Sequence, residues 1–231
     1  MPSQDPTVVL AHGAWADGSS WAKEITALAA RGVRALAAPL PLTSFADDVA
    51  ALDRTFERAD GPVVLVGHAY AGAVIGAIRD ERVGALVYVA ALAPDEGETV
   101  ADVFYRAEPH PQAPKLAPDR HGLIYLPDAS IAQAFAPNAS PQEHTVLAAV
   151  QRPISPACIT VAMQRPLWKD RPAWYLVAEQ DRMIVHGTQR FMAERMKARV
   201  RCHSVDHTPL VTAPSVVVDI ICEALQPAAS R

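Results

Sequence analysis

The chain has few cysteines, no long apolar run and no strong excess of charge of either sign. Its three cysteines, Cys158, Cys202 and Cys222, are odd in number and widely spaced in 231 residues, which indicates neither a disulfide framework nor a zinc site. Their apolar or strand-like neighbours predict buried thiols. The histidines lack metal-ligand spacing as well, so we expect no metal and no cofactor.

Other absences exclude classes of partner. No run approaches the ~20 apolar residues of a membrane span, and the N-terminal sequence lacks the basic and apolar regions of a signal peptide, so we expect a cytoplasmic protein. A net charge of −4 argues against a nucleic-acid or anionic-membrane surface. No Lys-Ser or Lys-Thr pair follows Gly72, so the stretch from Gly67 to Gly72 is not a phosphate loop.

What is present is a regular alternation of apolar β-rich runs and segments with helical periodicity. The β-rich runs are residues 7–11, 33–37, 62–66, 85–90, 173–178 and 200–205, and the helical segments are residues 19–30, 44–59, 72–79, 188–197 and 214–225. This alternation predicts an α/β fold with a mostly parallel sheet of about six strands and helices on both faces. The length predicts a single domain over residues 1–231.

The stretch from about residue 94 to 166 breaks the alternation. It has no evident strand, many prolines and short helical patches at residues 99–106, 130–135 and 142–150. One interpretation is a loose insertion stiffened by proline. Because long insertions inside compact domains are usually functional, we favour a helical cap over the active site, which would limit the size of the substrate.

The stretch from Val63 to Gly72 reads as a strand, a sharp turn and a helix, the arrangement that presents a catalytic serine. Ala69 stands where that serine is expected. Two later strand-like runs end in an acid, Asp181, and a histidine, His207. The chain order of nucleophile position, acid and base is the one used by serine hydrolases with the α/β-hydrolase fold.

The roles of these side chains follow from their chemistry. His207 would take a proton through one ring nitrogen, while Asp181 accepts a hydrogen bond from the other and fixes the tautomer. Glu179 and Asp206 lie beside them in the sequence. Alternation along an extended segment turns both acids to the opposite side, so we expect a solvated pair.

Backbone amides and aromatic side chains complete the predicted site. Gly13 permits a sharp turn after the first strand, so the amides of Ala14 and Tyr70 can donate to the same oxyanion. The candidates to line an apolar pocket under the cap, each with ordinary core packing as its alternative, are Trp15, Tyr70, Phe104, Tyr125, Phe135 and Trp168.

The remaining histidines are expected to be structural or superficial. His12 and His68 lie beside tight turns and are expected to hold the backbone. The histidines in polar surroundings, expected at the surface, are His110, His121, His144, His186 and His203.

Together these motifs resemble the small α/β-hydrolase esterases, the group that also contains plant methylesterases and hydroxynitrile lyases. The stretches that carry the resemblance are Val8 to Trp15 with Ser20 and Trp21, Pro41 to Asp48, Gly67 to Val74, Leu86 to Pro94, and the segments of Asp181 and His207. In that family the turn usually reads Gly-His-Ser-Tyr followed by Gly-Gly or Ala-Gly. The resemblance therefore implies a serine at position 69, Asp181 as acid, His207 as base, and the amides of Ala14 and Tyr70 as the oxyanion hole.

Three functions are compatible with these residues. The first is a hydrolase of small hydrophobic carboxylic esters or lactones, with its serine replaced by Ala69 in an engineered inactive variant; the intact acid, base and oxyanion turns favour it. The alternative is a native lyase or decarboxylase without a serine, in which the His207-Asp181 dyad works with the oxyanion hole. Methylketone synthases of the family, which carry alanine at this turn, imply that activity. A non-catalytic ligand-binding protein is the second alternative.

Overall fold

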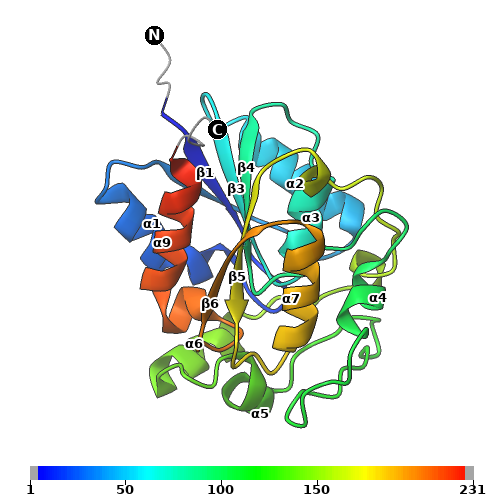
Figure 1. Ribbon diagram of the computed structural model, residues 1–231. Coiled ribbons are helices and arrows are strands. Elements are labelled where there is room, and N and C mark those ends of the chain that lie inside the picture. Colours follow the sequence, from blue (N-terminus) through cyan, green and yellow to red (C-terminus); the bar gives the residue numbers. More distant parts are fainter. Residues whose placement is uncertain (1–4, 227–231) are drawn as a thin grey trace.

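The computed structural model describes residues 5–226, and within that range it contains one six-stranded sheet (Figure 1). The strand order is β2-β1-β3-β4-β5-β6, and all neighbouring strands run parallel. The strands are β1 (Thr7–Ala11), β2 (Ala35–Ala38), β3 (Val63–His68), β4 (Val83–Val89), β5 (Ala173–Ala178) and β6 (Arg199–His203). The predicted α/β class and parallel sheet are confirmed.

The central strands are buried because each carries an almost unbroken apolar run. β1, β3 and β5 are buried along their whole length, and β4 is exposed only at Gly84. Such runs are typical of parallel strands that are covered on both faces. The edge strand β6 is mostly exposed, and Arg199 and Arg201 place charges there that discourage pairing with a second chain.

Helices cover both faces of the sheet (Figure 1). On one face α9 (Pro214–Leu225) contacts β3, β4 and β5 and packs against α1 (Ala22–Ala29), which follows η1 (Gly18–Trp21). On the other face lie α2 (Phe45–Phe56), α3 (Ala71–Ala77) and α7 (His186–Arg195). The short α8 (Pro209–Thr212) precedes α9. This arrangement confirms the predicted helical layers.

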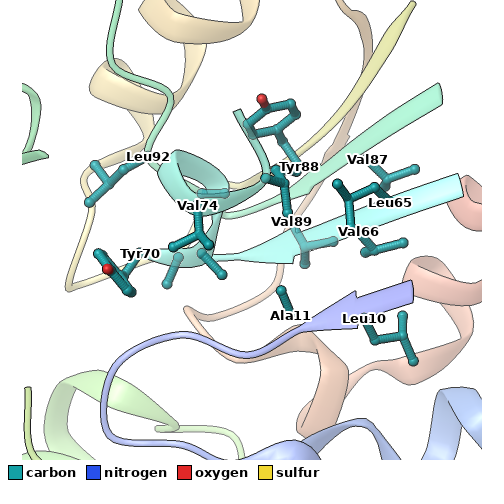
Figure 2. Close-up of a cluster of buried hydrophobic side chains, with 14 of the residues drawn as sticks. Leu10, Ala11, Leu65, Val66, Tyr70, Val74, Val87, Tyr88, Val89 and Leu92 are labelled. Atoms are coloured by element: carbon teal, nitrogen blue, oxygen red, sulfur yellow. The ribbon is translucent and has the colours of Figure 1, made fainter. Parts of the chain in front are cut away.

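The apolar core continues to the carboxyl ends of the strands. Leu10, Leu65 and Val87 lie on the neighbouring strands β1, β3 and β4 and are fully buried. Burying one such leucine stabilises the fold by about 1.5–3 kcal/mol. Figure 2 shows Tyr70 and Leu92 beyond the strand ends, beside this core. The residues that follow the strands are therefore fixed by packing.

Residues 90–172 connect β4 to β5. Their middle part lies beyond the carboxyl ends of the strands, and their last residues return past α3 to the start of β5 (Figure 1). Their elements are α4 (Val100–Phe104), α5 (Asp128–Ser130), the π-helical turn η2 (Ile131–Phe135), α6 (Pro141–Val150), η3 (Pro156–Cys158) and η4 (Leu167–Lys169). An isolated antiparallel bridge pairs Ile124 with Ile154. The elements are short because proline donates no backbone hydrogen bond and interrupts regular structure.

None of the helices within residues 5–226 has the length and apolar character that crossing a membrane requires.

Candidate active site

Ala69 lies in a tight turn between β3 and α3. Its φ of +49° is left-handed, which is uncommon for a residue with a side chain. The turn is held by the Ala69 amide, which donates to the Val89 carbonyl at 3.2 Å, and by the Ala69 carbonyl, which accepts from Leu92 at 2.9 Å. A Cβ at Gly67 would come within 2.8 Å of the Ala71 carbonyl oxygen, so only glycine fits there. The turn presents the methyl group of Ala69 to a cavity.

Asp181 follows β5 and His207 follows β6, and the structure brings the two side chains together. His207 Nδ1 lies 2.8 Å from Asp181 Oδ2, and both side chains are buried. A carboxylate accepts hydrogen bonds, so Nδ1 carries the proton and Nε2 is left as the basic nitrogen. His207 lines the same cavity as Ala69.

Each oxygen of the Asp181 carboxylate accepts two hydrogen bonds. Oδ1 accepts from the amides of Met183 and Ile184 at 2.7 and 2.9 Å. Oδ2 accepts from Gln189 Nε2 at 2.8 Å in addition to His207. Gln189 is buried in α7, and its own Oε1 accepts from the Ala178 amide. Gln189 was not predicted from the sequence. The only indication there is that an uncharged polar residue occurs on the helix that follows β5.

The candidate oxyanion amides belong to two turns that lie against each other. Ala14 and Tyr70 both line the cavity, and neither amide donates to another residue in the described part of the chain. A Cβ at Gly13 would stand 2.9 Å from Ala69 Cβ and 3.1 Å from His68 Nδ1. Glycine at position 13 therefore allows the close approach of the two turns.

Trp15 ties the first of these turns to residues 90–172. Its φ is +58°, its amide donates to the Arg152 carbonyl at 3.1 Å, and its Nε1 donates to the Ile124 carbonyl at 3.0 Å. Ile124 in turn pairs with Ile154. The conformation of the turn thus depends on hydrogen bonds from a segment more than 100 residues away in the sequence.

Tyr70 is held from behind by a buried acid that the sequence reasoning did not single out. The Tyr70 hydroxyl donates to Asp48 Oδ2 at 2.7 Å, and Asp48 Oδ1 accepts from the Leu42 amide at 2.7 Å. Burial raises the pKa of Asp48, and burial followed by the charge of Asp48 raises the pKa of Tyr70. The Cys158 thiol joins this cluster, and burial raises its pKa to about 12.

His68 and His12 are buried beside the turns. His68 Nε2 donates to the His207 carbonyl at 2.7 Å, and His12 Nδ1 lies 2.9 Å from the Gly13 carbonyl. Burial lowers the pKa of His68 to about 3 and that of His12 to about 4, so both are neutral at pH 7. Both therefore act on the backbone, as expected from their positions beside the turns.

The cavity at Ala69 has a volume of about 90 Å³ and an almost entirely apolar lining. Its lining residues are Ala14, Trp15, Ala69, Tyr70, Leu92, Val100, Ala101, Phe104, Tyr105, Leu116, Ile124, Ile154, Ile159, Met183, Ile184 and His207. Trp15, Tyr70 and Phe104 are the predicted aromatic residues among them. No Lys, Arg, Asp or Glu occurs in this lining as far as residues 5–226 define it.

The other three predicted pocket aromatics lie elsewhere. Tyr125 is 48% exposed and outside the cavity. Phe135 is buried behind the site, with its ring 5.4 Å from the His207 ring. Trp168 packs under the Arg195 guanidinium. These assignments were wrong because aromatic residues fill a core as readily as a binding site.

The expectation that Asp206 is solvated was also wrong. Asp206 is fully buried and accepts from the amides of Asn138 and Thr208 and from the Thr212 hydroxyl. The chain turns after β6, so the alternation of an extended strand does not apply there. Glu179 is exposed and pairs with Arg190 at 3.1 Å.

The cysteine and histidine expectations need smaller corrections. Cys158 is buried, but Cys222 is intermediate and Cys202 is exposed on the edge strand β6. His144 is half-buried, and its Nε2 lies 2.8 Å from the Ala136 carbonyl. His110 and His203 are half-buried as well, whereas His121 and His186 are exposed. No group of three or more metal-ligating side chains is found among residues 5–226.

The parallel sheet, the tight turn after β3 and the acid and histidine after β5 and β6 define an α/β hydrolase. The chain belongs to the alpha/beta hydrolase family, whose sequence model matches residues 8–220. The membership expected from the motifs is confirmed. Comparison with curated protein sequences gave no match.

Solved structures of esterases share the fold over almost the whole chain. A pyrethroid hydrolase from Sphingobium faniae JZ-2 is 20% identical, covers 95% of this chain and 97% of its own, and has a TM-score of 0.80. Polyneuridine aldehyde esterase is 18% identical, with coverage of 95% and 99% and a TM-score of 0.79. The methylesterase MES16 from Arabidopsis is 16% identical, with coverage of 95% and 98% and a TM-score of 0.78.

Proposed function

We propose that this protein is built to hydrolyse small, uncharged carboxylic esters or lactones, and that Ala69 occupies the place of the nucleophilic serine. The observation that carries the proposal is the 2.8 Å hydrogen bond between His207 and Asp181, beside a turn that holds residue 69 at a φ of +49°. The apolar cavity, whose lining within residues 5–226 has no charged side chain, supports an uncharged substrate. The similarity in fold to esterases supports the reaction class.

With serine at position 69, the reaction follows from these groups. His207 Nε2 takes the hydroxyl proton as the oxygen attacks the ester carbonyl, and the carbonyl electrons move to its oxygen. The amides of Ala14 and Tyr70 donate to that oxyanion. The alkoxide leaves with the proton from His207, and water then hydrolyses the acyl-enzyme in the same way. A methyl group cannot attack, so Ala69 leaves a site that holds the ester without forming an acyl-enzyme.

Restoring the hydroxyl tests the proposal. Ala69→Ser is expected to give a burst of alcohol release from a small ester such as phenyl acetate, with a rate at least 10³-fold above that of the unchanged chain. The double variant Ala69→Ser with His207→Gln serves as the control for non-specific hydrolysis and is expected to lose that gain. Equal rates for Ala69→Ser and the unchanged chain would contradict the proposal.

Residues 94–166 are proposed to act as the cap of this site. Half of the described residues that line the cavity, from Val100 to Ile159, come from this segment. It is proposed to form one domain with the sheet, because its carbonyls anchor Trp15. The cytoplasmic location expected from the N-terminal sequence stays a prediction.

A decarboxylase without a serine is the second candidate. The apolar lining favours it because a carboxylate that loses its water there is destabilised relative to the transition state, in which the negative charge spreads onto the ketone. When a 3-oxo acid loses carbon dioxide, the electrons of the breaking carbon–carbon bond move to the ketone and form an enolate. The two amides stabilise the enolate oxygen, and a proton then returns to carbon. The unchanged chain is expected to release carbon dioxide from 3-oxo acids if this candidate is correct, and His207→Gln is expected to slow that release.

A further inference from the structure

A second cavity adjoins the one at Ala69. It has a volume of about 270 Å³ and lies between the end of α4, residues 105–116 and the loop before α7. The two cavities share Phe104, Tyr105, Leu116 and Met183 in their walls. These four residues therefore lie between the outer cavity and the inner one, and one of them, Tyr105, is 60% exposed.

The inner cavity is too small to hold more than the reacting part of an ester. An engineered cavity of about 150 Å³ accommodates one benzene, whereas the inner cavity has about 90 Å³. A carbonyl with one small substituent fills it. The inner and outer cavities together reach the range of about 300–1,000 Å³ that ligand pockets usually occupy.

The residues that line the outer cavity favour an uncharged, apolar group. Its lining is mainly apolar and includes Ala107, Pro109 and Ala113. Glu108 and Lys115 lie in it as well, and their opposite charges favour neither an anion nor a cation.

We propose that the outer cavity binds the larger of the two groups of an asymmetric, uncharged ester, while the inner cavity accepts only a small group beside the carbonyl. This inference rests on the proposed ester hydrolysis and specifies its substrates: one substituent of one to three carbons, and one bulky apolar substituent such as an aromatic ring system. Residues 104–116 then determine which esters bind, although they lie outside the hydrogen-bonded site.

Filling the outer cavity tests the proposal. Ala107→Trp places a large side chain on an exposed position of the outer wall, so it leaves the core intact. Ala113→Trp repeats the test from a half-buried position in case one variant folds poorly. The matched control is Ala149→Trp on α6, an exposed alanine outside both cavities.

Two measurements separate this proposal from the proposed function. By calorimetry, the unchanged chain is expected to bind 2-acetylnaphthalene, an unreactive carbonyl with one small and one bulky group. Ala107→Trp is expected to weaken that binding at least tenfold, while Ala149→Trp leaves it unchanged. In the Ala69→Ser background, Ala107→Trp is expected to lower kcat/KM at least tenfold for 2-naphthyl acetate and less than twofold for ethyl acetate.

The outcomes are distinguishable. If Ala69→Ser hydrolyses no ester, the proposed function fails, and the binding measurement with 2-acetylnaphthalene alone decides on the outer cavity. Equal binding by Ala107→Trp, Ala113→Trp and Ala149→Trp would overturn the inference. Equal losses on 2-naphthyl acetate and ethyl acetate would also overturn it, because the outer cavity would then make no distinction by size.

Discussion

Ala69 keeps a backbone conformation that is unfavourable for any residue with a Cβ. The left-handed region costs such a residue roughly 1–2 kcal/mol, and hydrogen bonds from Gly72 and Leu92 to its carbonyl hold it there. Strain of this kind persists where the surrounding structure determines the backbone, and it often belongs to a functional site. In this fold the strained turn places the side chain of residue 69 in the wall of the cavity that His207 also lines.

The buried hydroxyl of Tyr70 is predicted to matter for stability through Asp48. Tyr70→Phe removes the donor to Asp48 Oδ2 and leaves that buried oxygen without its 2.7 Å hydrogen bond. We expect the free energy of unfolding to fall by about 1–3 kcal/mol, measured by urea denaturation.

Tyr88→Phe is the matched control for Tyr70→Phe. The Tyr88 hydroxyl is also buried, but it has no hydrogen-bond partner among residues 5–226. Its removal is expected to be neutral or stabilising. A loss of stability in Tyr88→Phe equal to that in Tyr70→Phe would show that the Asp48 hydrogen bond contributes nothing specific.

Single residues of the site differ in how far the sequence predicts them. Asp181 and His207 are predictable because each follows a strand and the chain order of the motifs is informative. Asp48 and Gln189 are not, because their partners are far from them along the chain or across a loop, and only tertiary packing brings them together. The prediction for Asp206 was wrong because side chains alternate between two faces only within a strand, and Asp206 lies beyond the end of β6.

At the scale of elements, the site depends on two turns that meet at Gly13. Gly13→Ala would push a methyl group against Ala69 Cβ at 2.9 Å and His68 Nδ1 at 3.1 Å. Both neighbours are buried and fixed, so the turn after β1 has to shift. We expect a loss of about 1–3 kcal/mol in the free energy of unfolding, again measured by urea denaturation.

The same substitution at Gly187 separates this contact from a general effect of alanine. Gly187 lies in α7 and does not adopt a positive φ. Apart from its chain neighbours and the backbone of its own helix, no atom of residues 5–226 lies within 4 Å of the added Cβ. Gly187→Ala is expected to stabilise the protein by about 0.4–1 kcal/mol, because it restricts the unfolded chain. The contact at Gly13 would be refuted if both variants changed stability in the same direction and by the same amount.

The regular elements and the segment between β4 and β5 differ in how well their sequences predict them. Buried parallel strands leave continuous apolar runs and amphipathic helices leave a helical period, so the existence of these elements was predictable. Between β4 and β5 the elements are short, and the bridge between Ile124 and Ile154 has no pattern of its own. Its carbonyls nonetheless anchor Trp15, a contact that only the folded chain reveals.

At the scale of the whole molecule, the alternation of strands and helices predicted the parallel arrangement but not the order of the strands. β1 lies between β2 and β3, and this crossover brings the turns after β1 and β3 side by side. Pairing of β3 with β4 and of β5 with β6 places the remaining strand ends in the same row. The order of strands therefore assembles the site from segments as far apart in the sequence as Ala14 and His207.

The folded molecule shifts the pKa of several buried groups, and each shift links stability to pH. Burial lowers the pKa of His12 to about 4 and of His68 to about 3. The unfolded chain therefore binds more protons below about pH 6.5, and stability falls as the pH falls from there towards 4 and 3. Burial acts in the opposite direction on Glu24 in α1, whose pKa is raised to about 8.

Because Glu24 is buried, we expect the protein to lose stability at alkaline pH. Both of its carboxylate oxygens are buried and find no hydrogen-bond partner within residues 5–226. The folded protein keeps the Glu24 proton from about pH 4.5 to pH 8, where the unfolded chain has lost it. The contribution of Glu24 is thus fully present below pH 4.5 and is lost as the pH rises through 8, at about 1.4 kcal/mol for each unit of pKa shift.

Glu24→Gln is therefore expected to be more stable than the unchanged chain at pH 9 and closer to it at pH 5, because the amide has the shape of the protonated acid and does not ionise. Urea denaturation at the two pH values measures the difference. Glu57→Gln, at an exposed position after α2, is the control for the loss of one negative charge and is expected to change stability little at either pH. If Glu24→Gln and the unchanged chain lost the same stability between pH 5 and pH 9, Glu24 would not be the group that weakens the fold at alkaline pH.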